Sequence, residues 1–167
     1  LADILRMCIS PEEFVPLHRE VDVLHRYIEI QKIRLSDNFT FQVKLPAELQ
    51  TCMVPKMLLQ PIVENSIIHG LNGISNCNIQ VEAAKGKDGM LHITVTDNGH
   101  GLPEGMVGKP YSRDKMLAGN HLGLYNVDTI LSKHFGDGCG LYLDAGPGGI
   151  GTAVTATLPI RMEDPLC

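Results

Sequence analysis

Hydrophobic side chains recur every three to four positions in three segments of the chain, which is the spacing of a helix with one buried face. These segments are 17–35, 56–69 and 122–135. In the first segment, charged residues such as Glu20 stand between the hydrophobic positions, so we expect them on an exposed face. The pattern therefore predicts three helices.

Proline and glycine indicate where the helices begin and end. Gly70 directly follows the second helix and is a typical C-terminal signal. Pro61 lies inside that helix and has no amide hydrogen, so it predicts either a kink or a helix that effectively begins near it. Residues 1–9 are typical of the end of a helix that has been cut, and residues 10–13 predict a helix stop and restart.

Alternating hydrophobic and polar residues predict five strands. They lie at 39–45, 77–84, 90–97, 140–144 and 153–158. A short polar turn joins the second strand to the third, which predicts an antiparallel hairpin. The order of elements is not the regular strand–helix–strand series of a parallel sheet, so it indicates an α+β fold with mainly antiparallel pairing.

The composition is that of one globular domain, with at most an additional helical arm. The chain has 167 residues, of which 44% are hydrophobic, and a net charge of −5. An acidic chain without basic clusters is a poor binder of nucleic acid, and no hydrophobic run approaches the length of a transmembrane helix. The five cysteines are widely spaced and indicate reduced thiols in the cytosol. The chain does not begin with methionine, so we expect it to be a piece of a longer protein.

A loop at 98–121 is long for a compact domain, and such loops are usually functional lids or disordered. The chain contains neither the glycine–lysine loop of phosphate-loop NTPases nor the glycine pattern of dinucleotide-binding folds. It also lacks the usual patterns of serine and cysteine nucleophiles. The sequence therefore disfavours these classes of enzyme.

A polar stripe interrupts the hydrophobic second helix. Pro61, Asn65 and His69 are spaced four apart and so share one helix face. Glu64 lies beside this stripe. The carboxamide oxygen of Asn65 is a hard, neutral ligand of the kind that suits Mg²⁺. The alternative is that Asn65 is a core residue with an internal hydrogen bond.

An acidic residue ends the strand at 90–97. Asp97 is followed by Gly99 and Gly101, and this segment is either a simple turn or part of a ligand pocket. In a pocket, the Asp97 carboxylate would accept a hydrogen bond from an amino group such as that of adenine. The two glycines would then let the backbone approach the ligand closely.

Two more glycine-rich segments lead into regular elements. Gly119 and Gly123 lead into the third helix, whose first backbone amides would bind phosphate without a basic side chain. Gly151 and Thr152 open the last strand, where the alternative is an ordinary hairpin turn. Each segment is a weak indication of a site when taken alone.

Together, the order and spacing of these segments resemble the ATP-binding domain of the GHKL superfamily, which groups gyrase, a heat-shock chaperone, histidine kinases and MutL. The chain is similar above all to sensor histidine kinases of the cell-envelope and autolysis-sensing type. The resemblance covers nearly the whole chain and rests on YIEIQKIR (27–34), VPKMLLQPIVENSIIHG (54–70), DNGHGLP (97–103) and GLYNV (123–127). It implies a two-layer sandwich, in which helices cover one face of a mixed, mainly antiparallel sheet, preceded by a helical arm.

On the adenine side, the resemblance implies that Asp97 binds the adenine amino group of ATP. Gly99 and Gly101 would shape the adenine pocket, and Thr152 would support it. The residues that would hold the phosphates below the lid are Gly119, Gly123 and Leu124.

On the metal side, the resemblance implies that Asn65 ligates Mg²⁺. His69 would belong to the same nucleotide-binding face. Glu64 would be a catalytic neighbour that polarises the phosphate acceptor or a water molecule.

Three positions depart from the family pattern. Ile68 stands where a lysine is usual, His121 where a glycine is common, and Ile130 where an arginine is common. Basic residues of the long loop would compensate for the missing charge: Lys109, Arg113 and Lys115. These departures leave nucleotide binding expected and put catalytic efficiency in question.

The resemblance also implies what surrounds the chain in the larger protein. Residues 1–36 would be the end of the dimerisation and phosphotransfer region with its connecting helix, and 37–167 the catalytic domain. The γ-phosphoryl group of ATP would pass to a histidine upstream of this chain, because none of the seven histidines lies in the family's Asn-Pro-His-Phe motif. A homodimer, a response regulator as partner, and a cytoplasmic position in a membrane-anchored sensor are implied as well.

Two alternatives stay open. The first is an ATP-driven clamp or a protein-serine kinase on the same fold, which would normally carry glutamate at the position of Pro61. The second is a non-catalytic interaction module, which Ile68 and Ile130 would permit.

Overall fold

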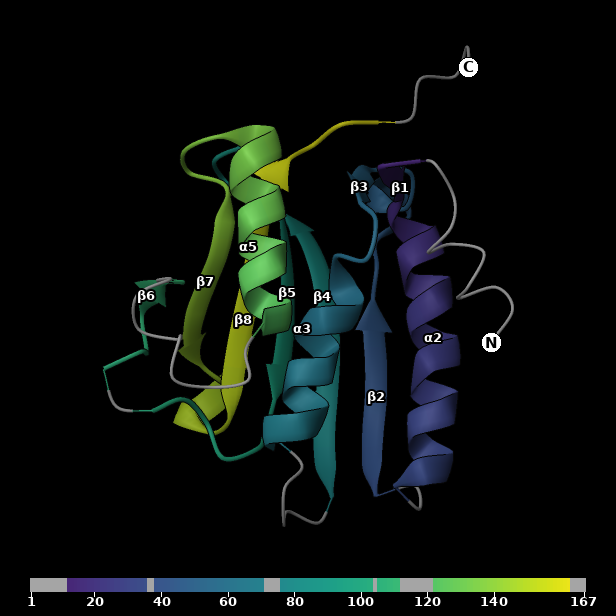
Figure 1. The fold of residues 1–167 in the computed structure, drawn as a ribbon, viewed down its shortest axis with the longest axis vertical. Coiled ribbons are helices and arrows are strands. Elements are labelled where there is room, and N and C mark those ends of the chain that lie inside the picture. The colour runs from purple at the N-terminus through teal and green to yellow at the C-terminus, as the bar shows by residue number, and fades with distance from the viewer. Residues whose placement is uncertain (1–11, 36–37, 71–75, 104, 112–121, 163–167) are drawn as a thin grey trace.

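Six strands form one sheet, and the helices lie side by side on one of its faces (Figure 1). The computed structural model describes residues 12–35, 38–70, 76–103, 105–111 and 122–162. Within these ranges the helices are α2 (Leu17–Arg34), α3 (Leu59–Asn65) and α5 (Leu122–Phe135). The expected two-layer α+β sandwich is confirmed.

The sheet has the strand order β2-β4-β5-β8-β7-β6. Strands β2 and β4 run parallel, and every other neighbouring pair is antiparallel. The strands are β2 (Phe39–Lys44), β4 (Cys77–Lys85), β5 (Met90–Asp97), β6 (Lys109–Pro110), β7 (Gly140–Ala145) and β8 (Thr152–Pro159). All five predicted strands are present, and β6 is a short edge strand within the predicted loop.

The alternation along the strands decides which face of the sheet carries the helices. In β5, the side chains of Leu91, Ile93 and Val95 are fully buried, whereas the residues between them, such as Thr94, are partly exposed. Successive side chains of a strand point to opposite faces, so one face of the sheet is hydrophobic and the other polar. The helices cover the hydrophobic face and form a single core with it.

The segment predicted as one helix at 56–69 is divided into several elements. Strand β3 (Met53–Pro55) is followed by a turn in which Met57 has a φ of 62°. Helix α3 then ends at Asn65 and continues as one π-helical turn, Ser66–Gly70. Pro61 lies in the first turn of α3, where a missing amide hydrogen breaks no helical bond. Of the two expectations for Pro61, the helix that begins near it is therefore confirmed.

Glu20 was expected on the exposed face of the first helix, and this expectation is wrong. Its residue is 3% exposed, and its two carboxylate oxygens accept hydrogen bonds from the backbone amides of Met57 (2.8 Å) and Leu59 (3.1 Å). No local side chain caps the start of α3, so Glu20 supplies the cap from a neighbouring helix. Burial raises the pKa of Glu20, and the hydrogen bonds from these amides oppose that rise.

We expect Glu20→Ala to lower the free energy of unfolding by about 2–4 kcal/mol, because the buried amide of Leu59 and the partly buried amide of Met57 lose their acceptor. Glu29→Ala is the matched control, since Glu29 is an exposed carboxylate on the same helix, and a change within about 0.5 kcal/mol is expected. Urea unfolding measures both values. Equal losses for the two variants would contradict the role of Glu20 as a cap.

The predicted helix restart at residues 10–13 is also wrong, as far as the structure describes this segment. Glu12 and Glu13 lie outside any helix, and strand β1 (Phe14–Pro16) follows them. This strand pairs antiparallel with β3, almost forty positions later in the chain. Pairing with so distant a segment leaves no local pattern, which explains why the strand was not predicted.

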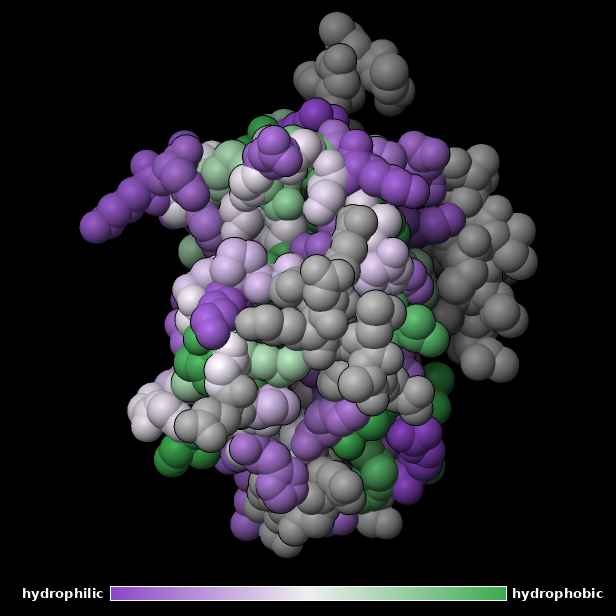
Figure 2. Space-filling model, turned by 60° about the vertical axis from the view of Figure 1, so that its left-hand side comes forward, coloured by the Kyte–Doolittle hydropathy of each residue, from purple (hydrophilic) through white to green (hydrophobic). Residues whose placement is uncertain are grey.

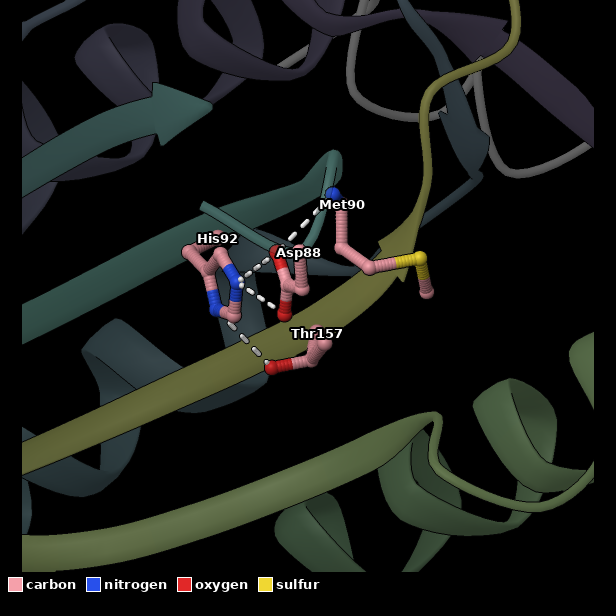
Figure 3. A network of polar contacts seen from close by, with 4 residues as sticks. All are labelled: Asp88, Met90, His92 and Thr157. Carbon is pink, nitrogen blue, oxygen red and sulfur yellow. Dashed lines mark hydrogen bonds and ion pairs between the residues drawn. The ribbon is translucent and has the colours of Figure 1, made fainter. Parts of the chain in front are cut away.

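The predicted turn between β4 and β5 is held by a network of polar contacts (Figure 3). The carboxylate of Asp88 accepts a hydrogen bond from the amide of Met90 (3.0 Å) and lies 3.0 Å from His92 Nε2. The other ring nitrogen of His92 lies 3.2 Å from the hydroxyl oxygen of Thr157 in β8. The bond from Met90 and then the contact with His92 lower the pKa of Asp88. The network thus ties the hairpin to the neighbouring strand, at the end of β5 opposite to Asp97.

Hydrophilic and hydrophobic residues are interspersed on the face that Figure 2 shows, and the hydrophobic ones form small separate groups. Exposed hydrophobic side chains occur mostly one at a time along the chain, as at Ile33, Ile68 and Ile150. None of the helices in the described residues has both the length and the hydrophobicity needed to cross a membrane.

Candidate functional site

A pocket of about 210 Å³ lies between the outer face of α3 and the first turn of α5. Its lining contains five of the residues predicted for the site, together with Pro61 and Ile68. These five are Glu64, Asn65, His69, Gly123 and Leu124. The structure therefore brings the predicted polar stripe of one helix next to the predicted phosphate-binding start of another.

Helical spacing separates the lining of α3 from its core side. Ile62, Val63 and Ile67 are at most 4% exposed and face the sheet, whereas Asn65 is only partly buried and lines the pocket. The π-helical turn after Asn65 continues this arrangement through His69. π-Helical turns are rare in proteins as a whole, and those that occur are often found at functional sites.

The first turn of α5 packs closely against α3. A Cβ atom added to Gly123 would lie 3.2 Å from the Cβ atom of Pro61, which is closer than most such contacts. Leu124, the next residue, is 1% exposed and anchors the turn in the core. A glycine at this position therefore lets the backbone amides of α5 come close to the polar stripe of α3.

Asp97 is buried at the end of β5, with 3% of its surface exposed. Its Oδ1 atom accepts hydrogen bonds from the backbone amides of Gly99 (2.9 Å) and Thr152 (3.2 Å). These bonds close the turn after β5 and join it to the start of β8. Three residues predicted for the adenine side are thus held together by one carboxylate oxygen.

Close backbone contacts connect Asp97 to the pocket. A Cβ atom on Gly70 would lie 3.2 Å from the Asp97 carboxylate, and one on Gly99 would collide with the backbone of Gly70. Gly101 has a φ of +79° and lies against the carbonyl of Gly151. The end of the α3 segment therefore abuts the turn after Asp97. The predicted metal side of the site, on α3, and the predicted adenine side, at Asp97, are thus neighbours.

Two glycines of this junction were not among the predicted site residues. Gly70 was predicted only as the end of a helix, and Gly151 only as part of a glycine-rich turn. Gly151 has a φ of +71°, and a Cβ atom there would collide with the carbonyl oxygen of Asp97. The glycines before Thr152 could have indicated a close backbone contact, but the sequence does not say which backbone Gly151 approaches.

A further link joins the pocket to α2. Burial raises the pKa of Tyr27 to about 12, and the negative charge of Glu64 contributes to that rise. Tyr27 is 9% exposed on the inner side of α2. The Glu64 carboxylate in the pocket lining therefore lies within electrostatic range of Tyr27 in α2.

Of the remaining residues singled out in the sequence, some lie outside the described residues, and two others, Lys109 and Ile68, are described by the structure. Gly119, His121, Arg113 and Lys115 lie outside the described residues. Lys109 lies in β6, where its ammonium group donates a hydrogen bond to the carbonyl of Gly105 (2.7 Å). Ile68 lines the pocket and is 52% exposed, so a hydrophobic side chain stands where the family pattern has a charge.

The oxygen atoms that line the pocket are of the kind that would suit a magnesium ion bound together with a nucleotide. In the described part of the chain, no group of three or more His, Cys, Asp or Glu side chains is arranged to hold a metal. The pocket offers the carboxamide of Asn65 and the carboxylate of Glu64 instead. Mg²⁺ is usually bound by one or two protein oxygens, with water and substrate phosphates completing its shell.

Comparison with known proteins identifies the family. The family model for "Histidine kinase-, DNA gyrase B-, and HSP90-like ATPase" matches residues 54–162, and the model for "Histidine kinase" matches residues 1–39. Sensor histidine kinase YesM of Bacillus subtilis is 31% identical over 91% of this chain, and sensor histidine kinase BtsS of Escherichia coli is 30% identical over 92%. The chain spans 25% of the length of each of these relatives.

Solved structures agree with this result at the level of the fold. The catalytic domain of histidine kinase ThkA has a TM-score of 0.67 at 18% identity, over 90% of this chain and 97% of that one. The mycobacterial sensor histidine kinase MprB has a TM-score of 0.62 at 23% identity, over 90% of this chain and 99% of that one. The chain therefore belongs to the histidine kinase-, DNA gyrase B- and HSP90-like ATPase family, and its fold is that of the ATP-binding catalytic domain of a sensor histidine kinase.

Proposed function

We propose that the pocket between α3 and α5 binds ATP with Mg²⁺, and that the larger protein transfers the γ-phosphoryl group to one of its own histidines upstream of this chain. The observation that carries the proposal is the position of Asp97. This carboxylate is buried, and it adjoins the end of the helical segment whose outer face lines the pocket. A buried acceptor next to a pocket is suited to reading an amino group.

On the adenine side, Asp97 is the acceptor for the amino group. Its Oδ1 atom already accepts two backbone hydrogen bonds, so the amino group is left to Oδ2. The same two bonds hold the carboxylate in one orientation, which lowers the conformational cost of binding. Gly99, Gly101 and Thr152 thus form the frame of the adenine subsite.

On the phosphate side, Asn65 is the metal ligand, and the backbone amides of Gly123 and Leu124 are phosphate donors, with Gly119 of the lid as a further contact. His69 belongs to the same face, and Glu64 polarises the acceptor or a water. When bound, Mg²⁺ supplies charge neutralisation for the phosphates. Since phosphoryl transfer has a loose transition state, the chain contributes mainly positioning and electrostatic stabilisation. Ile68 contributes no charge there, so we expect slow turnover.

For the larger protein, we propose a homodimeric, membrane-anchored sensor with this domain in the cytoplasm and a response regulator as the recipient of the phosphoryl group. Residues 1–36 are then the end of the dimerisation region, and residues 37–167 the catalytic domain. Support comes from the match of residues 1–39 to the histidine kinase model and from relatives that are sensor histidine kinases.

A non-catalytic nucleotide-binding module is the second candidate. The exposed Ile68 in the pocket lining favours it, because the described lining contains no lysine or arginine side chain to face the phosphates. Turnover distinguishes the two candidates: only a kinase phosphorylates a histidine of its own upstream region when that region is present.

The test of the proposed site is Asp97→Asn. We expect the parent to bind Mg·ATP well below millimolar concentration and to reject GTP, which has a carbonyl oxygen at the position of the amino group. The variant should bind ATP about 10- to 150-fold more weakly, because a hydrogen bond to a charged acceptor contributes roughly 1.5–3 kcal/mol. Selectivity against GTP should fall at the same time, since the carboxamide also has a donor.

Titration calorimetry with non-hydrolysable analogues measures both affinities. Asp88→Asn is the control, because Asp88 is a carboxylate at the other end of β5. No heat from the parent at millimolar nucleotide would contradict the nucleotide site altogether. Unchanged affinity and selectivity in Asp97→Asn would remove Asp97 from the adenine contact.

A further inference from the structure

Two contacts join the beginning of the described chain to the helices that line the pocket. Phe14 of β1 contacts the last turn of α5, and Glu20 of α2 caps the first turn of α3. The contact of Phe14 lies at the end of α5 away from the pocket, and the cap at Leu59 lies two residues before Pro61, where the pocket lining of α3 begins. Figure 1 shows β1 and the start of α2 at the same end of the molecule as the C-terminal end of α5.

The contact of Phe14 is an aromatic cluster. Its ring meets the ring of His134 edge to face, with 5.1 Å between centroids and 82° between planes, and the ring of Phe135 at 5.9 Å and 70°. The guanidinium of Arg161 lies over the ring of Phe135, 4.9 Å from its centroid. Edge-to-face pairs are attractive beyond the area they bury. The last turn of α5 is therefore held from the N-terminal and C-terminal segments together.

Backbone pairing holds Phe14 in place. Strand β1 pairs with β3, where the amide of Lys56 donates to the carbonyl of Glu13 (2.9 Å). The next residue of the chain after Lys56 is Met57, whose amide is bound by Glu20. The aromatic contact and the carboxylate cap are therefore parts of one corner, formed by β1, β3 and the start of α2.

This corner joins the two segments that different family models match. Phe14 and Glu20 lie in residues 1–39, which match the histidine kinase model. Their partners, such as Leu59 and Phe135, lie in residues 54–162, which match the ATPase model. The contacts thus connect the upstream region to the nucleotide-binding body.

Both helices that contact the corner, α3 and α5, also contribute residues to the lining of the pocket. Helix α5 runs from Gly123 at the pocket to Phe135 at the corner, and α3 runs from its cap at Leu59 to Asn65. A helix is a stiff element, and a packed interior transmits a small displacement of one end to the other. A tilt of either helix changes the distance between Asn65 and the first amides of α5.

We propose that Phe14 and Glu20 are positioning residues of the nucleotide site. They set the placement of α3 relative to α5. A movement of residues 1–39 that displaces the corner of β1 and the start of α2 would therefore change the affinity of the pocket for nucleotide. This inference rests on the proposed function for its effect on ATP, whereas its effect on the two helices is independent of ATP.

The test compares Phe14→Ala with Phe41→Ala. Phe41 of β2 makes an equivalent edge-to-face contact with His25 of α2 (5.6 Å, 83°), but this contact involves neither α3 nor α5. The first measurement is amide hydrogen exchange without nucleotide. Phe14→Ala should speed exchange of the amides in 126–130, the first ones of α5 with intrahelical hydrogen bonds, at least tenfold, and Phe41→Ala less than twofold.

The second measurement is the affinity for Mg·ATP, well below the melting temperature of each variant. Phe14→Ala should weaken binding about fivefold or more, Phe41→Ala less than twofold, and Phe14→Tyr, which keeps the ring, should restore the affinity of the parent. Equal effects of Phe14→Ala and Phe41→Ala on exchange and affinity would overturn the proposal, because they would indicate a loss of general stability. If the parent binds no nucleotide, the proposed function fails and the exchange comparison alone decides this inference.

Glu20 is tested in the same way. Glu20→Gln keeps the shape of the side chain but has one acceptor oxygen for two amides, and Glu29→Gln is the control on the exposed side of α2. We expect about tenfold faster exchange at the pocket end of α3 and weaker Mg·ATP binding in Glu20→Gln only. An unchanged exchange rate at that end in Glu20→Gln would remove Glu20 from the positioning role.

Discussion

Asn65→Ala is expected to abolish the Mg²⁺-dependent part of nucleotide binding and to leave the melting temperature without nucleotide nearly unchanged. Asn65 lines the pocket and is partly exposed, whereas its helix neighbours Ile62 and Ile67 fill the core. Removing a carboxamide from the pocket face therefore costs little packing, and alanine favours the helix. The loss of a ligand to a charged group is worth roughly 1.5–3 kcal/mol, which corresponds to about a 10- to 150-fold weaker affinity.

The measurement is the melting temperature and the ATP affinity, each with and without Mg²⁺. Gln60→Ala is the control, because Gln60 is a carboxamide on the same helix that does not line the pocket. In the parent and in the control, Mg·ATP should raise the melting temperature by mass action, and in Asn65→Ala this increase should disappear. A large fall in melting temperature without nucleotide, together with an unchanged Mg²⁺ dependence, would show that Asn65 is a structural core residue.

Gly151→Ala is expected to lower the free energy of unfolding by about 2–5 kcal/mol. Gly151 has a φ of +71°, which costs a residue with a Cβ atom about 1–2 kcal/mol. In addition, the new methyl group would collide with the carbonyl oxygen of Asp97 and the Cα atom of Asn98, and forcing extra atoms into a packed site costs about 1–3 kcal/mol. The obstacle is backbone, so no side chain rotation can relieve it.

Gly89→Ala separates the two contributions. Gly89 has nearly the same φ, +78°, but a Cβ atom there would meet nothing within 4 Å. We therefore expect a loss of only about 1–2 kcal/mol, from the backbone conformation alone. Urea unfolding measures both variants. Similar losses for the two would contradict close packing of the Gly151 turn on Asp97, and with it the rigid frame of the adenine subsite.

Patterns confined to one element predicted that element well. The strands were found from alternation, and α5 from its helical spacing, because each buries one face against the same core. The segment 56–69 was harder, since hydrophobic residues at helical spacing do not distinguish one continuous helix from a turn followed by a short α-helix and a π-helical turn. The backbone of Met57, with a positive φ, is stabilised by Glu20, which no local pattern of this segment contains.

In the candidate site, too, local spacing predicted some residues, whereas contacts between distant segments were not predicted. The stripe of Pro61, Asn65 and His69 follows from helical spacing alone, and the structure places it at a pocket. The roles of Asp97 and the glycines came from the order of motifs and the resemblance to a family, and they remain predictions. The contacts of Gly70 and Gly151 with the Asp97 turn were not foreseen, because a glycine shows that space is needed but not which atoms require it.

The sequence by itself determined the α+β class and the five longer strands through periodicity, and motif order determined the family, whose resemblance implied the two-layer fold. Only the tertiary structure decided that Glu20 is a buried cap, that Phe14 begins a strand, and that the Asp97 turn adjoins the end of α3. Each of these contacts joins residues more than twenty positions apart. Their energies arise from desolvation and close packing between segments, which exist only once the chain has folded.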